Sequence, residues 1–162
     1  MAGFTAFTWF HTILSLIALV AGFVVVNGLL QSRVPAWWTA TYLATALGTS
    51  LTGFGFDSPF QASHVFGILS ILLLVPAIFG LYVYELGGAW RWIFAAGVVI
   101  TLYLDAFVAV VQAFRKIPFL HPLAPTESEP PFAVAQLILL AIFVWLTYAA
   151  VKKFRPAAIV PA

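Results

Sequence analysis

The sequence predicts an all-α integral membrane protein, a bundle of five transmembrane helices, from composition and the lengths of its apolar runs. Of the 162 residues, 64% are hydrophobic and only 7% are charged, whereas about 25% of the residues in a soluble domain are charged. The hydrophobic residues form five runs that reach the ~20 residues needed to cross a bilayer. The basic residues lie at the ends of these runs, which is typical of membrane orientation signals and not of a nucleic-acid interface.

Breaks in the apolar pattern define the five spans. Arg33 and Pro35 follow the first run, Gly87 and Gly88 follow the third, and a segment with five prolines follows the fourth. The predicted spans cover residues 7–30, 37–56, 63–85, 90–114 and 132–151. We expect residues 1–155 to form a single transmembrane domain, residues 115–131 an outer proline-rich loop, and residues 156–162 a disordered tail.

The positive-inside rule orients the bundle. With the C-terminus inside, five basic residues lie on the inner side and two on the outer side. The inner set is Arg33, Arg91, Lys152, Lys153 and Arg155, and the outer set is Arg115 and Lys116. The sequence therefore predicts an N-out, C-in topology, with Glu85 on the inner side, where we expect it to pair with Arg91.

This orientation gathers the chemistry-bearing residues at the outer face. All three histidines, His11, His64 and His121, fall there with Asp57, Glu127 and Glu129. Asp57 and His64 belong to the polar break 52–67 between the second and third spans. We therefore expect a ligand or cofactor site at this face.

His11 and His64 are the candidate cofactor ligands. Imidazole is a common ligand of haem iron, zinc and copper, and two histidines on different spans are the minimum for bis-His haem b. With Asp57 they are also the candidate ligands of a divalent metal. The alternative is that both are interfacial residues that hydrogen-bond to nearby loops.

Asp105 is the candidate proton or ligand site inside the membrane. It lies near the middle of the fourth span, where an ionised carboxylate without a cationic partner costs several kcal/mol. We therefore expect Asp105 to be protonated or to face a hydrated cavity. Gln112, two helical turns later, shares its face. The alternative is a structural hydrogen bond to a threonine of a neighbouring helix.

The second span carries a row of hydroxyl groups. Thr41, Thr45, Thr49 and Thr52 recur at helical spacing and share a face. Such residues let helices approach closely in lipid, so a packing seam is one interpretation. The other is a polar lining for a ligand path, with Thr49 as its candidate ligand-binding residue.

Two further possibilities are weaker. The outer loop could add Glu127, Glu129 and His121 to a divalent-cation site, or these groups could simply be solvated. Catalytic signatures, such as a nucleophile elbow, are absent from the sequence, so we predict no catalytic residues. With no cysteine, thiolate metal sites and iron–sulfur clusters are excluded.

Several segments resemble small hypothetical inner-membrane proteins of proteobacteria. They are F-H-T-I-L-S-L from Phe10, S-H-V-F-G-I-L-S from Ser63, residues 102–105, Q-A-F-R-K-I-P from Gln112, and L-A-P-T-E-S-E-P-P-F from Leu123. The resemblance runs from the first span to the fifth and implies a bacterial inner-membrane location, but it implies no activity.

Three functions follow as hypotheses. The first is a ligand- or cofactor-binding protein or accessory subunit with its site at the outer face, in contact with lipid and with other membrane subunits or further copies of itself. The second is an electron carrier that uses bis-His haem or a quinone. The third is a proton- or cation-coupled transporter that uses Asp105, although the odd number of spans argues against an inverted-repeat transporter.

Overall fold

The computed structural model describes residues 6–56 and 62–156, and every regular element in these ranges is helical. The long helices are α1 (Ala6–Leu30), α2 (Ala36–Thr52), α3 (Ala62–Tyr82), α4 (Trp90–Lys116) and α5 (Pro130–Lys153), and the short 3-10 turns are η1 (Gly53–Gly55) and η2 (His121–Leu123). Four of the helices, α1, α3, α4 and α5, are long and apolar enough to cross a membrane. The prediction of an all-α bundle with membrane-spanning helices is therefore confirmed at this level, whereas α2, with 17 residues, is shorter than the others.

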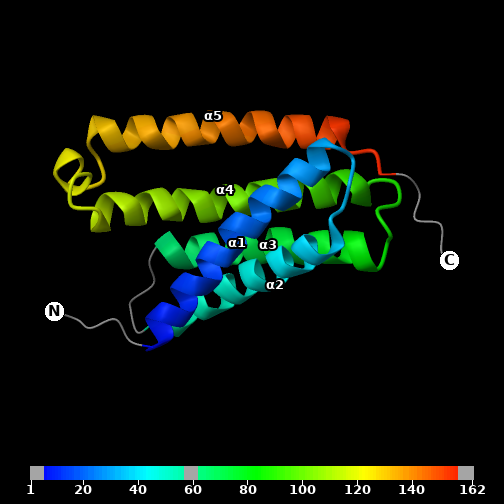
Figure 1. Cartoon of the computed structure of the whole chain (residues 1–162), viewed down its shortest axis with the longest axis horizontal. Coiled ribbons are helices and arrows are strands. Elements are labelled where there is room, and N and C mark those ends of the chain that lie inside the picture. Colours follow the sequence, from blue (N-terminus) through cyan, green and yellow to red (C-terminus); the bar gives the residue numbers. More distant parts are fainter. Residues whose placement is uncertain (1–5, 57–61, 157–162) are drawn as a thin grey trace.

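Helix α4 lies at the centre of the bundle. It packs against α1, α3 and α5, while α2 packs against α1 and α3. Successive helices run back and forth along one direction, and α1 crosses the others obliquely (Figure 1). We call the end with residues 53–56 and 117–129 the loop end, and the end with residues 31–35, 83–89 and 154–156 the turn end.

The core is built from small residues that let the helices approach closely. Gly22 in α1 lies under the Tyr42 and Leu102 side chains, since a Cβ there would stand 2.5 Å from Leu102 Cδ1 and 2.9 Å from Tyr42 Cε2. Tyr42 is fully buried, and its hydroxyl donates to the Val98 carbonyl at 3.0 Å. Small residues at helix crossings are the usual means of packing in lipid, where burial of apolar surface gives no driving force.

The turn end is held together by main-chain carbonyls. The Ser32 hydroxyl donates to the Lys153 carbonyl at 2.6 Å and accepts from the Arg155 N–H at 3.0 Å. Arg91 donates to the Phe154 carbonyl. The predicted Glu85–Arg91 ion pair is therefore wrong: among the described residues the only salt bridge is Arg115–Glu127, because Arg91 reaches the C-terminal segment instead.

Two helices end before the sequence predicts. Helix α3 ends at Tyr82, and in the turn that follows Glu85 and Leu86 adopt positive φ angles of 47° and 60°, with the Leu86 N–H bonded back to the Gly80 carbonyl at 2.8 Å. The 6→1 bond of a helix C-cap runs from the Tyr84 N–H to the Phe79 carbonyl at 3.0 Å. Helix α2 ends at Thr52, where η1 begins. There the Phe7 ring lies against Gly55, 2.7 Å from where a Cβ would be.

Candidate functional site

A cavity of about 680 Å³ opens between α1, α2, α3 and α4 in the half of the bundle nearest the loop end. Its volume falls in the ~300–1,000 Å³ range of ligand pockets. All four helices contribute polar side chains to its lining: Thr8, His11, Thr12, Ser15, Thr49, Ser50, His64, Ser70, Asp105, Gln112 and Lys116. Polar groups from separate apolar runs therefore converge on one space.

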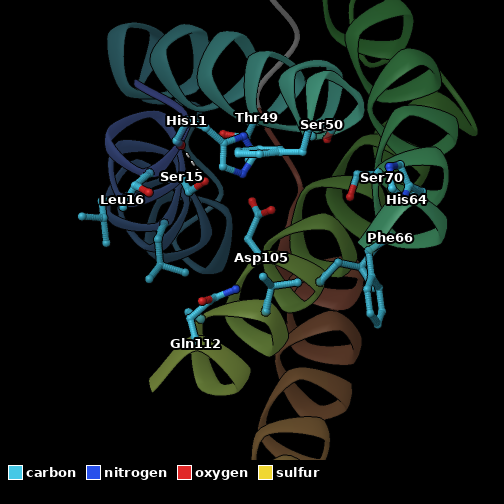
Figure 2. Close-up of a pocket in the computed structure, with 18 of the residues that line it drawn as sticks. His11, Ser15, Leu16, Thr49, Ser50, His64, Phe66, Ser70, Asp105 and Gln112 are labelled. Carbon is cyan, nitrogen blue, oxygen red and sulfur yellow. Dashed lines mark hydrogen bonds between the residues drawn. The ribbon is translucent and has the colours of Figure 1, made fainter. Parts of the chain in front are cut away.

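Asp105 is the central acid of this cavity. Its carboxyl points from α4 toward His11 and Thr49 on the other side (Figure 2). Asp105 Oδ2 and Thr49 Oγ1 are both buried and have no hydrogen-bond partner among the described residues. An unsatisfied buried polar atom costs about 1–3 kcal/mol. Two such atoms facing one cavity mark a place where a ligand would gain by supplying the missing partners.

The geometry around His11 fixes the roles of its ring nitrogens. His11 Nδ1 lies 2.9 Å from Thr52 Oγ1, and that hydroxyl gives its single proton to the Gly48 carbonyl at 2.7 Å. With its proton on that carbonyl, the hydroxyl accepts from His11, and this arrangement assigns the proton of the neutral ring to Nδ1. In the neutral ring, Nε2 is left with a lone pair and is the nitrogen available to a ligand.

His64 lies on a different wall of the cavity from His11. It extends from α3 beside Ser70, is 8% exposed, and packs against the Phe54 ring with centroids 5.6 Å apart (Figure 2). The Phe54 ring of η1 thus covers part of His64.

Apolar groups complete the lining. Phe54, Phe56 and Phe66 contribute aromatic rings, and Leu16 and Val108 contribute aliphatic surface. The Phe56 ring also packs edge-on against His11, with centroids 5.1 Å apart. The cavity thus combines a few directed polar groups with apolar walls, which is the usual composition of a small-molecule site.

The structure brings together most of the residues singled out in the sequence. His11, His64, Thr49, Asp105 and Gln112 all line the cavity, whereas Asp57 lies outside the described residues. The roles assigned to them remain predictions. Sequence reasoning missed three serines that also line it, Ser15, Ser50 and Ser70. Their only signal was a hydroxyl within an apolar run, which is equally typical of helix packing.

The hydroxyl protons of two of these serines are already engaged. Ser15 donates to the His11 carbonyl and Ser50 to the Ala46 carbonyl, both at 2.9 Å. Each oxygen is then left as a hydrogen-bond acceptor. Together with His11 Nε2, they make one side of the cavity rich in acceptors.

The carboxylates of Glu127 and Glu129 form hydrogen bonds or an ion pair with residues of the 115–131 segment itself. Glu127 forms a two-pronged ion pair with Arg115. The Thr126 hydroxyl, at 2.8 Å, with the Thr126 and Ser128 N–H groups, holds the pKa of the Glu129 carboxyl below its usual range. In the described part of the chain, no three His, Asp or Glu side chains gather as a metal site would require.

No protein-family model, curated protein or solved structure matches the chain. The chemistry of the cavity therefore rests on the residues that line it.

Proposed function

We propose that the protein is a small membrane protein that binds a ligand in the cavity between α1, α2, α3 and α4, with Asp105 as its polar anchor. The observation that carries this proposal is a buried Asp105 carboxyl oxygen that has no hydrogen-bond partner among the described residues, in a cavity of about 680 Å³. A carboxyl group at this depth is costly unless it acquires partners. A ligand with a hydrogen-bonding head would supply them, while its apolar part would lie against the phenylalanine and leucine side chains.

We further infer five spans in an N-out, C-in orientation in a bacterial inner membrane. Helix α2 would rise about 26 Å and η1 about 6 Å more, which together approach the ~30 Å of the hydrocarbon layer. The turn end carries Arg33, Arg91, Lys152, Lys153 and Arg155, and the loop end carries Arg115 and Lys116. An inward-facing turn end satisfies the positive-inside rule.

Cysteine labelling tests this orientation, because the chain contains no cysteine of its own. Phe119→Cys places a thiol in the exposed α4–α5 loop, and Ala89→Cys places one in the exposed turn before α4. In spheroplasts, a membrane-impermeant maleimide should label Phe119→Cys at once and Ala89→Cys only after permeabilisation. The reverse pattern would mean that the C-terminus faces outward, and labelling of both sites in intact cells would refute the five-span arrangement.

Native mass spectrometry tests ligand binding. Ala109→Trp should fill much of the cavity from α4, whereas Ala141→Trp adds the same bulk to the exposed face of α5. We expect the protein purified from its host membrane to carry a bound small molecule. Ala109→Trp should reduce its occupancy by about tenfold, and Ala141→Trp should leave it unchanged. Equal occupancy in both variants would refute binding in this cavity.

A further inference from the structure

Leu16 and Gln112 mark a side opening of the cavity between α1 and α4. Both residues line the cavity and are also exposed, Leu16 at 57%. They lie on the same side of the cavity, one on each helix (Figure 2). Leu16 is ten residues into α1, which places it about 15 Å from the start of the helix. Gln112 is four residues before the end of α4, about 6 Å from it. In a bilayer spanned by these helices, the opening would extend from near the loop end toward the hydrocarbon layer.

Formal charge at the cavity is sparse. Asp105 and Lys116 are the only acidic and basic side chains among the described lining residues, and Lys116 stands at the last residue of α4. A phosphate head group is usually held by clusters of Arg or Lys. The deep part of the cavity has none and carries an acid instead, so an anionic lipid head does not fit there.

The hydrogen-bonding groups of the deep part suit an uncharged head that both donates and accepts. His11 Nε2, Ser15 Oγ and Ser50 Oγ accept, and an uncharged Asp105 carboxyl can donate one hydrogen bond and accept others. The Phe54 and Phe56 rings on the walls favour a flat ring over a flexible polar chain.

From these observations, and resting on the proposed function, we propose that the ligand is a lipid-soluble molecule of the quinone or quinol type that enters from the bilayer between Leu16 and Gln112. Its ring lies between His11 and Asp105, with its ring oxygens hydrogen-bonded to them. Its apolar tail leaves through the side opening into lipid.

Binding of a short-tailed quinone to the full chain in nanodiscs tests the proposal. We expect ubiquinone-2, reduced to its quinol, to bind at least tenfold more tightly than the same ring without its isoprenoid tail, because the tail adds apolar contact along the opening. Leu16→Trp should slow uptake of the tailed quinol several-fold. Leu140→Trp, on the exposed face of α5, should not. Equal affinity for the tailless ring with no effect of Leu16→Trp would overturn access from the bilayer.

Two matched variants at His11 test the position of the ring. His11→Asn can keep a donor near the Nδ1 position for Thr52 but loses the group at the Nε2 position, whereas His11→Gln can present an amide near Nε2. We expect His11→Asn to weaken quinol binding by about tenfold and His11→Gln to weaken it less. Equal affinities for the two variants and the wild type would overturn the assignment of His11.

The outcomes separate this inference from the proposed function. If quinols do not bind, but a co-purified molecule is still lost in Ala109→Trp, the cavity binds a ligand of another class and the quinol assignment is wrong. If Ala109→Trp changes neither the co-purified molecule nor quinol binding, ligand binding in the cavity and the quinol assignment both fail.

Discussion

Asp105→Leu is expected to weaken ligand binding by about tenfold or more while raising the thermal stability of the protein. The loss follows because the ligand head would be left with an unpaired polar group, at a cost of about 1–3 kcal/mol. The gain in stability follows because Asp105 Oδ2 is buried and has no hydrogen-bond partner among the described residues. Leucine has the same number of side-chain heavy atoms and the same branching as aspartate, and the cavity has room for its larger methyl groups, so it would remove that cost.

The two effects have opposite signs, and this combination identifies a functional residue. A residue that served only to hold α4 in place would lose stability and binding together. Binding can be measured by native mass spectrometry of the protein in nanodiscs, and stability by thermal unfolding of the ligand-free protein in detergent. A fall in melting temperature in Asp105→Leu would contradict the account of Asp105 as an unsatisfied group.

Asp105→Asn is the matched variant. The amide keeps a donor and an acceptor in nearly the same positions but cannot ionise. If the ligand is an uncharged head held by hydrogen bonds, Asp105→Asn should retain most of the affinity that Asp105→Leu loses. If Asp105→Asn and Asp105→Leu lose equal amounts of ligand affinity, binding requires a charge or a transferable proton at this position. The proton- or cation-coupled function then becomes the better account.

Tyr42→Ala is expected to have the largest effect on stability. Tyr42 is fully buried where α1, α2 and α4 meet, with its ring against Gly22 and its hydroxyl on the Val98 carbonyl. Removing a buried aromatic side chain costs about 3–5 kcal/mol in a packed core. Because Gly22 leaves no side chain to fill the space, we expect a cost toward the upper end of that range.

Two control variants separate the contribution of the Tyr42 hydroxyl from that of its buried ring. Tyr42→Phe removes only the hydroxyl and should cost about 1 kcal/mol. Tyr82→Ala removes the same side chain from the exposed end of α3, where it is 60% exposed, and should change stability little. The measurement is the free energy of unfolding in mixed micelles. Equal losses in Tyr42→Ala and Tyr82→Ala would show that the packing at Gly22 does not stabilise the bundle.

The apolar runs were sufficient to predict the helices, but the exact ends depended on contacts between distant segments. Span length and helix-breaking residues placed α1, α4 and α5 within a few residues of their observed bounds. Helix α3 was predicted to continue to residue 85, but it ends at Tyr82 and is followed by a turn in which Glu85 and Leu86 have positive φ angles, which are unusual for these residue types. Neither residue type favours a positive φ angle, so the sequence does not predict this backbone conformation.

The cavity could be predicted only in part, for a related reason. An acid in an apolar run, such as Asp105, is conspicuous because its burial is costly. Ser50 and Ser70 are not, since a serine in a membrane helix can bond its own backbone at little cost, as Ser50 does with Ala46. Which hydroxyls face the cavity depends on how the helices rotate against each other, and no spacing within a single run encodes that. The hydrogen-bond partner of Arg91 was predicted wrongly for the same reason, because the Phe154 carbonyl that it contacts lies 63 residues away in the sequence.

The most direct test of a ligand site anchored at Asp105 is an experimental structure of the protein purified from its host membrane into nanodiscs. The account predicts density for a bound molecule in the cavity, with its polar head between Asp105 and His11 and its apolar part directed toward Leu16. A cavity that holds only ordered water, or that is closed by α1 packing directly against α4 at Asp105, would contradict it.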